Sequence, residues 1–220
     1  MQFKSGNNLK LRILTSLILV FILILMMINN YVLSYIVTVT GIFSLIEFFK
    51  INSIIFKNKK NKRFLSNLLF VIYIFIFTSA FITFSFYFHF KIFIFAILLA
   101  CIASDIGGFV FGKIFKGPRL TSVSPKKTIA GALGSLIFSS VLLLSLFYYL
   151  TGNLNFLVMI IGLCISIGSQ AGDLLFSYLK RMSKIKDTGN LLPGHGGILD
   201  RIDSILIGMP VGLFSIILFY

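Results

Sequence analysis

Residues 177–203 read SYLKRMSKIKDTGNLLPGHGGILDRID, a charged, glycine-containing stretch between two apolar segments. It holds five of the 20 basic and three of the six acidic residues of the chain, namely Lys180, Arg181, Lys184, Lys186, Arg201, Asp187, Asp200 and Asp203. No other part of the chain has this density of both charges. The polar stretch is therefore the predicted functional centre, and the apolar segments around it decide the fold.

The composition of the whole chain indicates a membrane protein. Its 220 residues are 58% hydrophobic, include 26 Phe and have a mean hydropathy of +1.02, values of the membrane class. The net charge of +14 lies in short clusters between apolar runs, which argues against nucleic-acid binding and favours anionic lipids and substrates. Cys101 and Cys164 are isolated, so they predict neither a disulfide framework nor a zinc site.

Seven segments are apolar over the roughly 18 residues that a membrane-spanning helix needs. They are about residues 11–29, 31–49, 64–82, 91–112, 129–150, 156–179 and 203–220. The first is too long for the apolar core of a typical signal peptide and no small-residue cleavage site follows it, so we expect it to remain as an anchor. The sequence predicts an all-α, polytopic membrane protein with about seven transmembrane helices.

The basic residues predict an orientation, because cytoplasmic loops carry an excess of Lys and Arg. With the N-terminus in the cytoplasm, 19 of the 20 basic residues fall on the cytoplasmic side and only Lys91 falls on the other. All six acidic residues then lie in cytoplasmic loops or near cytoplasmic helix ends. We expect a multi-pass protein of the inner (cytoplasmic) membrane with its active site on the cytoplasmic face.

Glu47, Asp105 and Asp173 lie inside the predicted membrane helices 31–49, 91–112 and 156–179. Such a group costs about 2.5–3.5 kcal/mol at the bilayer centre and usually faces a cavity, a partner or an ion. Asp105 and Asp173 are therefore predicted to be functional. Glu47 leaves two interpretations, a functional carboxylate or an interfacial residue that pairs with Lys50 three positions later.

The sixth predicted helix has a polar face at its cytoplasmic end. Asp173, Ser177, Lys180 and Arg181 recur at i, i+4, i+7 and i+8. Oxygen atoms of Asp and Ser suit Mg²⁺, which is usually held by one or two carboxylates plus substrate phosphates. Snorkelling towards lipid headgroups is the alternative for the two cations, but it does not explain Asp173.

A glycine-rich turn and two further carboxylates follow this helix. The sequence PGHGG at residues 193–197 lets backbone N–H groups approach an anion closely. Asp200 and Asp203 come next, at i and i+3, a spacing that places both on one side of the last helix. The preference of Asp for helix N-termini is the alternative explanation, chiefly for Asp203.

The connection before residue 129 repeats this combination of charges. Lys113 ends the fourth predicted helix, and Ser124, Lys126 and Lys127 precede the fifth. Lysines and hydroxyls at a helix N-terminus form a phosphate site. Two cationic loops and several carboxylates on one membrane face predict a polyphosphate ligand with a divalent metal.

These residues resemble a known family. The pattern Ser177-x₂-Lys180-Arg181-x₄-Lys186-Asp187-x-Gly189-x₂-Leu192-Pro193-x-His195-Gly196-Gly197-Ile198-x-Asp200-Arg201-Ile202-Asp203 resembles the signature of the phosphatidate cytidylyltransferases (CDP-diacylglycerol synthases) at every specified position. Gln170-x-Gly172-Asp173 and Asp105…Gly112-Lys113…Ser124-Pro125-Lys126-Lys127-Thr128 are also similar to that family. The resemblance covers about residues 100–220.

The resemblance implies condensation of CTP with phosphatidate to CDP-diacylglycerol and pyrophosphate. It implies Mg²⁺ with K⁺ as a helper ion, Asp173 and Asp200 as metal ligands with Ser177 nearby, and a homodimer. Two departures stand out. Ala130 occupies a position where the family often has Glu, and the N-terminal part is shorter than in many family members.

The chemistry of the reaction agrees with these residues. Phosphatidate is largely dianionic at pH 7 and needs no strong base, so alignment and charge neutralisation are the main requirements. We expect Asp173 and Asp200 to hold the metal, and His195 to order the loop or donate to phosphate rather than act as a base. The remaining expected phosphate, metal or nucleotide contacts are Asp105, Lys113, Ser124, Lys126, Lys127, Lys180, Arg181, Arg201 and Asp203.

Functionally, residues 1–100 are interpreted as N-terminal transmembrane helices and residues 101–220 as the catalytic membrane domain. One alternative is a cytidylyltransferase for another membrane lipid phosphate, and another is loss of activity, motivated by Ala130. A transporter for an anionic lipid or solute is the alternative from another class. It predicts functional polar groups through the whole bilayer depth, whereas here they gather at one face.

Overall fold

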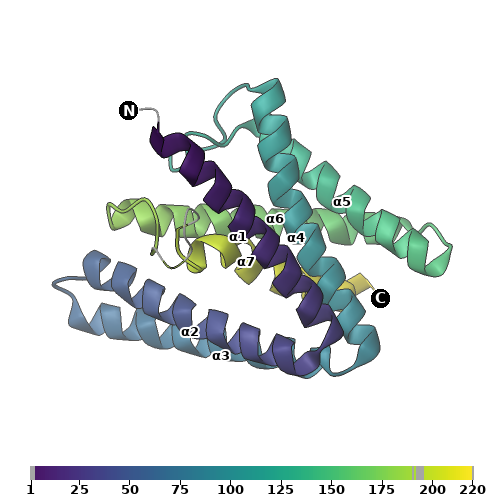
Figure 1. Cartoon of the computed structure of the whole chain (residues 1–220), viewed down its shortest axis with the longest axis horizontal. Coiled ribbons are helices and arrows are strands. Elements are labelled where there is room, and N and C mark those ends of the chain that lie inside the picture. Colours follow the sequence, from purple (N-terminus) through teal and green to yellow (C-terminus); the bar gives the residue numbers. More distant parts are fainter. Residues whose placement is uncertain (1–2, 190, 192–195, 220) are drawn as a thin grey trace. The chain divides into compact units, whose positions relative to one another are not determined.

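The computed structural model describes residues 3–189, 191 and 196–219, with side chains from residue 14 onwards. Over this part of the chain the secondary structure is helical, which confirms the predicted all-α class (Figure 1). The helices are α1 (Phe3–Ile28), α2 (Asn30–Ile55), α3 (Lys60–Ser85), α4 (Phe88–Phe115), α5 (Ile129–Thr151), α6 (Phe156–Met182) and α7 (Leu199–Phe219).

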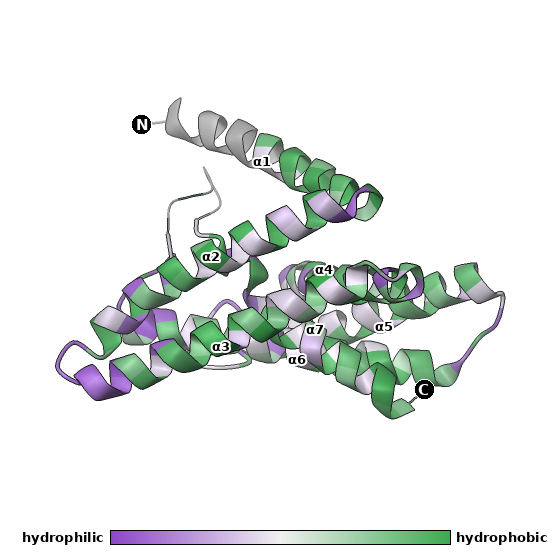
Figure 2. Cartoon of the chain, turned by 90° about the horizontal axis from the view of Figure 1, so that it is seen from below, coloured by the Kyte–Doolittle hydropathy of each residue, from purple (hydrophilic) through white to green (hydrophobic). Residues whose placement is uncertain are grey.

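The helices have the length and apolar surface of membrane spans. Among the described residues, α2 to α7 are long and apolar enough to cross a membrane, and α1 contributes the shorter apolar segment Leu14–Ile28. Figure 2 shows hydrophobic residues along the helices and hydrophilic residues in the connection between α2 and α3. Exposed side chains such as Phe75, Phe109 and Ile217 fit contact with lipid. The multi-pass membrane architecture is confirmed, whereas the orientation stays a prediction.

Local capping fixes several helix ends. The Asn29 side chain accepts hydrogen bonds from the backbone N–H groups of Tyr31 (2.8 Å) and Val32 (3.3 Å), which starts α2 one residue after α1 has ended. Gly152 ends α5 in the left-handed region at φ 71°. The short connections after α1 and α5 are therefore explained by capping chemistry.

The chain falls into two compact units. Unit 1 comprises Met1–Tyr87 with Met182–Arg201, and unit 2 comprises Phe88–Arg181 with Ile202–Tyr220. In unit 1, α2 and α3 run antiparallel side by side (Figure 1), with the rings of Phe48 and Phe70 stacked at 3.8 Å between centroids. These units reflect packing, so the predicted functional boundary at residue 100 stays a prediction.

Small residues bring the helices of unit 2 close together. A Cβ atom added to Gly107 of α4 would lie 2.5 Å from the carbonyl oxygen of Gly134 of α5, and one added to Gly162 of α6 would lie 2.6 Å from Ser140 Cα. Where the backbones approach this closely, only glycine fits. Cys101 is fully buried against this packing, as expected for a structural cysteine.

Candidate functional site

The loop between α4 and α5 (residues 116–128, the α4–α5 loop) folds back on itself. Leu120 N–H donates to the Lys127 carbonyl at 2.8 Å, and Ile129 N–H donates to the Pro118 carbonyl at 3.1 Å. Gly117 permits the sharp bend at the start of the loop with φ 100°. The two arms of the loop are thereby held together beside the start of α5.

The motif Ser124-Pro125-Lys126-Lys127 forms a turn at the tip of this loop. Lys127 N–H donates to the Ser124 carbonyl at 3.0 Å, and proline is favoured at the second position of such a turn. Thr128 then caps α5 by accepting from Gly131 N–H at 3.1 Å. Both lysines therefore lie immediately before a helix N-terminus, the placement that the sequence predicted.

A pocket of about 360 Å³ lies within unit 2 at this point. Its polar and charged lining comes in part from Asp105 of α4, Asp173 of α6, and Ser124, Lys126 and Lys127 of the α4–α5 loop. We call it the polar pocket. Its volume is in the range of small-molecule sites. Five of the predicted site residues, from three separate parts of the chain, thus line one cavity.

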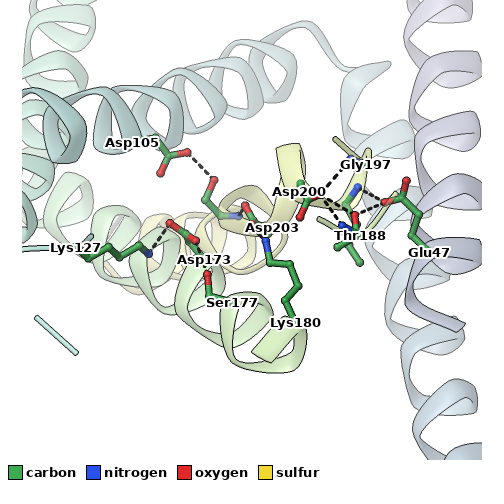
Figure 3. A network of polar contacts seen from close by, with 12 residues as sticks. Glu47, Asp105, Lys127, Asp173, Ser177, Lys180, Thr188, Gly197, Asp200 and Asp203 are labelled. Atoms are coloured by element: carbon green, nitrogen blue, oxygen red, sulfur yellow. Dashed lines mark hydrogen bonds and ion pairs between the residues drawn. The ribbon is translucent and has the colours of Figure 1, made fainter. Parts of the chain in front are cut away.

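Asp173 and Lys127 form an ion pair in the polar pocket, with 2.5 Å between Oδ2 and Nζ (Figure 3). Ser177 Oγ donates to the other oxygen, Oδ1, at 3.2 Å, which confirms the expected i, i+4 neighbours on α6. The side chains of Lys127 and Asp173 keep 25% and 32% of their surface exposed. The pair is therefore oriented by its neighbours and still accessible to a ligand.

The remaining carboxylates of unit 2 are bonded around the beginning of α7. Ser204 Oγ donates to Asp105 Oδ2 at 2.8 Å. Asp203 accepts from the Ser204 N–H at 2.8 Å and lies 3.9 Å from Lys180 Nζ (Figure 3). Asp203 is 7% exposed. It is thus far more shielded than Asp173.

The described residues between α6 and α7 (183–189, 191 and 196–198, called the α6–α7 loop) bond two carboxylates within unit 1. Asp200 Oδ2 accepts from the Thr188 N–H (2.8 Å), the Thr188 hydroxyl (3.0 Å) and the Gly197 N–H (3.1 Å). Glu47 of α2 accepts from the Thr188 hydroxyl (2.6 Å) and from the N–H groups of Ile198 (3.0 Å) and Leu199 (2.9 Å) (Figure 3). The Glu47 oxygens therefore bond the α6–α7 loop and the start of α7, and a functional role for Glu47 stays a prediction.

The other predicted site residues have more varied places. Lys113, in the last turn of α4, lies 5.7 Å from the centroid of the Phe109 ring. Arg181 and Arg201 are exposed at the end of α6 and the start of α7. His195 lies outside the described residues.

The expected metal pair is divided between the units, Asp173 in unit 2 and Asp200 in unit 1. Over the part of the chain that the structure describes, no group of three or more His, Cys, Asp or Glu side chains has the arrangement of a metal site. The joint action of Asp173 and Asp200 stays a prediction.

Two residues of the site, Thr188 and Ser204, were missed by the sequence reasoning. Thr188 stands at an unspecified position of the signature pattern, and Ser204 follows its last residue. Both are common hydroxyl residues whose partners are distant in the sequence. No local signal identifies them, since Thr188 bonds Glu47 across 141 residues and Ser204 bonds Asp105 across 99.

Comparison with known proteins adds independent information. A sequence model described as the Cytidylyltransferase family matches residues 4–219. Curated relatives named phosphatidate cytidylyltransferase include one from Staphylococcus haemolyticus, 41% identical over 110 residues (49% of this chain, 42% of that protein). One from Helicobacter pylori is 41% identical over 126 residues (56% and 46%), and one from Mycobacterium bovis is 40% identical over 114 residues (51% and 37%). The matched part covers less than half of each relative.

Proposed function

Because the chain belongs to the cytidylyltransferase family, we propose that it transfers CMP from CTP to phosphatidate, giving CDP-diacylglycerol and pyrophosphate. The observation that carries this proposal is the ion pair of Lys127 with Asp173, accessible in a pocket that has a second lysine at a helix N-terminus. The names of the relatives give the substrate. The polar pocket is lined by residues of the segment, about 100–220, over which the chain resembles the family.

The proposed reaction is a displacement at the α-phosphorus of CTP. A phosphate oxygen of phosphatidate forms the new bond to this phosphorus, and the bond from the α-phosphorus to the bridging oxygen breaks so that pyrophosphate leaves. The attacking phosphate is already largely dianionic at pH 7, because its second pKa is about 6. The protein therefore has to align two anions and offset their charge.

The lysines of the polar pocket are suited to this task. Lys126 and Lys127 place two cations before the N-terminus of α5, where unsatisfied backbone N–H groups also favour an anion. Asp173 holds Lys127 in the pocket. When the triphosphate enters, Lys127 would exchange one of its contacts for a phosphate oxygen, at little cost in side-chain ordering.

The donor atoms of the pocket fit Mg²⁺. Asp173 lines the pocket, and Ser177 is hydrogen-bonded to it one helical turn away. Their carboxylate and hydroxyl provide the oxygen ligands that Mg²⁺ prefers, and this ion normally completes its shell with phosphates and water. Asp173 and Ser177 would hold it together with CTP, where it would supply charge neutralisation on the triphosphate. Asp200 as a second ligand, and K⁺ as a helper ion, remain parts of this proposal.

The location of the site is also part of the proposal. We place the polar pocket at the cytoplasmic face of the inner membrane, because the basic connections lie on one side of the predicted topology. CTP would enter from the cytosol and phosphatidate from the bilayer. The homodimer implied by the family resemblance is expected to form in the same membrane.

An assay of the purified full chain tests this function. The protein in detergent micelles is incubated with CTP, phosphatidate and Mg²⁺, and CDP-diacylglycerol and pyrophosphate are measured. We expect the two products in equal amounts. A polyprenyl phosphate and an ether-linked phosphatidate serve as parallel substrates. Product from one of these alone would overturn the assignment to phosphatidate, and no product from any lipid would overturn the enzymatic function.

A further inference from the structure

Glu47 is a buried carboxylate that lies 141–152 residues in sequence from the groups it binds. It belongs to α2 and is 1% exposed. Oε1 accepts from Ile198 N–H at 3.0 Å, and Oε2 accepts from Leu199 N–H at 2.9 Å and from the Thr188 hydroxyl at 2.6 Å. A carboxylate is costly to bury unless its oxygens are hydrogen-bonded, so these bonds are what keep Glu47 in this position.

Two glycines of the signature are explained by the position of Glu47. A Cβ atom added to Gly189 would lie 2.5 Å from Glu47 Oε1, and one added to Gly197 would collide with both Glu47 and the Thr188 hydroxyl. Neither glycine has a positive φ, so backbone conformation alone does not require them. Glycine is needed at both positions because the α6–α7 loop closes around the Glu47 carboxylate.

Thr188 connects Glu47 to Asp200. Its hydroxyl lies 2.6 Å from Glu47 Oε2 and 3.0 Å from Asp200 Oδ2, and its N–H donates to the same Asp200 oxygen at 2.8 Å. A hydroxyl has a single hydrogen, so the two carboxylates compete for it. A change at Glu47 therefore reaches Asp200 through one intervening residue.

We propose that Glu47 is a positioning residue of the reaction, which holds the α6–α7 loop in its folded form and through Thr188 orients the carboxylate of Asp200. This inference rests on the proposed cytidylyltransferase function, in which Asp200 takes part. Glu47 itself touches no reacting atom. Its oxygens bond N–H groups at the start of α7 that have no earlier helical turn to bond, and a negative charge is favourable there.

Glu47→Gln is the informative substitution, since it keeps the size of the side chain. The glutamine amide has a single acceptor oxygen, whereas the carboxylate has two. Its NH₂ group would therefore face the N–H of Ile198 or of Leu199, and that hydrogen bond would be lost. We expect kcat to fall about 10- to 100-fold, the usual range when a supporting hydrogen bond to a ligand residue is removed, with a smaller change in KM for CTP.

The loop itself provides a readout that does not depend on activity. Hydrogen–deuterium exchange is measured for peptides that contain the Ile198 and Leu199 amides in the full chain. In Glu47→Gln these amides are expected to exchange at least about 10-fold faster, the change that loss of roughly 1.4 kcal/mol of protection gives. Thr188→Val should show the same pattern more weakly, and Thr188→Ser, which keeps the hydroxyl, should restore wild-type kcat.

Asn52→Ala is the matched control for damage to α2. Asn52 is buried on the same helix but bonds α3, with its Nδ2 2.6 Å from Asn67 Oδ1. This variant should lower the melting temperature and leave loop exchange and kcat within about 2-fold of wild type, the range expected away from the site. Hydrogen exchange is measured without substrates and so does not depend on activity. An inactive wild-type chain would refute the proposed function, while exchange would still test whether Glu47 holds the α6–α7 loop.

Two results would overturn the inference. One is wild-type exchange of Ile198 and Leu199 in Glu47→Gln. The other is a loss of kcat in Asn52→Ala as large as that in Glu47→Gln, because the effect would then come from weakened helix packing. Faster loop exchange in Glu47→Gln, together with a selective fall in kcat and rescue by Thr188→Ser but not Thr188→Val, would support it.

Discussion

The carboxylates Glu47 and Asp173 both lie on membrane-spanning helices, yet their surroundings differ. Glu47 is 1% exposed and is enclosed by loop amides and a hydroxyl, whereas Asp173 keeps 32% of its side chain exposed in the polar pocket. Glu47 accepts from backbone groups that cannot leave, while Asp173 pairs with a lysine that can change partners. The enclosed carboxylate of Glu47 therefore holds the backbone groups that it bonds, whereas the accessible carboxylate of Asp173 is available to a substrate.

The two carboxylates also differ in how much open space surrounds them. Around Glu47, Gly189 and Gly197 allow the backbone to close on the carboxylate. Around Asp173, the polar pocket retains a volume of about 360 Å³. Removal of a side chain should therefore affect loop order at Glu47 and ligand binding or chemistry at Asp173.

The largest effect is expected from Asp173→Asn. The substitution removes the charge that holds Lys127 and the carboxylate proposed for Mg²⁺, so kcat/KM should fall about 100- to 1,000-fold, the scale seen when a group that stabilises charge in the transition state is lost. Steady-state assays at varied CTP measure this. The α6–α7 loop should keep wild-type hydrogen exchange. Full activity of Asp173→Asn would break the distinction between the two carboxylates.

A somewhat smaller loss is expected from Lys127→Met. The methionine keeps much of the apolar length of the side chain but removes one charge-assisted contact to phosphate, so kcat/KM for CTP should fall about 10- to 100-fold. Lys57→Met, in the exposed connection between α2 and α3, is the control and should retain activity. Equal losses in both variants would indicate a general effect of basic charge rather than a contact in the polar pocket.

A local structural effect is expected from Gly189→Ala. Its methyl group would meet Glu47 Oε1 at 2.5 Å, and overpacking of this kind costs about 1–3 kcal/mol. Thermal unfolding in detergent and exchange of the α6–α7 loop measure it. Gly112→Ala is the comparison: its methyl group would lie 3.2 Å from the Thr128 hydroxyl oxygen, a milder contact than that at Gly189, so it should destabilise the protein less. Stabilisation by both substitutions would contradict the enclosed arrangement around Glu47.

The smallest effect is expected from Ala130→Glu, which restores the residue that the family often has. Ala130 is half-buried in the first turn of α5, and no acidic residue lies in that turn. A carboxylate there should stabilise the protein by about 0.3–1 kcal/mol through the helix dipole. The melting temperature and its salt dependence measure this change. A lower melting temperature would show that the new carboxylate disturbs the contacts of the α4–α5 loop.

Much of the fold followed from local sequence. The predicted helix at residues 129–150 corresponds to α5 (Ile129–Thr151), and its start is explained by the Thr128 cap. The sequence also predicted that the hydroxyl and lysines of the α4–α5 loop lie before a helix N-terminus, as they do, while phosphate binding stays a prediction. Such features are predictable because periodicity, capping and the placement of basic residues act over a few neighbouring positions.

The partners of the carboxylates were not predictable in this way. Nothing near Glu47 in the sequence distinguishes a bond to the α6–α7 loop from pairing with Lys50, and nothing near Asp105 identifies Ser204. These contacts join helices that are about 100 to 150 residues apart. They form only when the packed backbones bring the polar atoms within hydrogen-bonding distance.

By itself the sequence determined that this chain forms apolar helices of membrane-spanning length, with its charges gathered in a few connections. The physical reason is local, because transfer of an apolar segment into lipid depends on the composition of that segment. Only the tertiary structure decided which carboxylate is enclosed and which is accessible. That outcome depends on contacts between residues far apart in the sequence. The backbone at Gly189 and Gly197 closely approaches Glu47, and Lys127 forms an ion pair with Asp173.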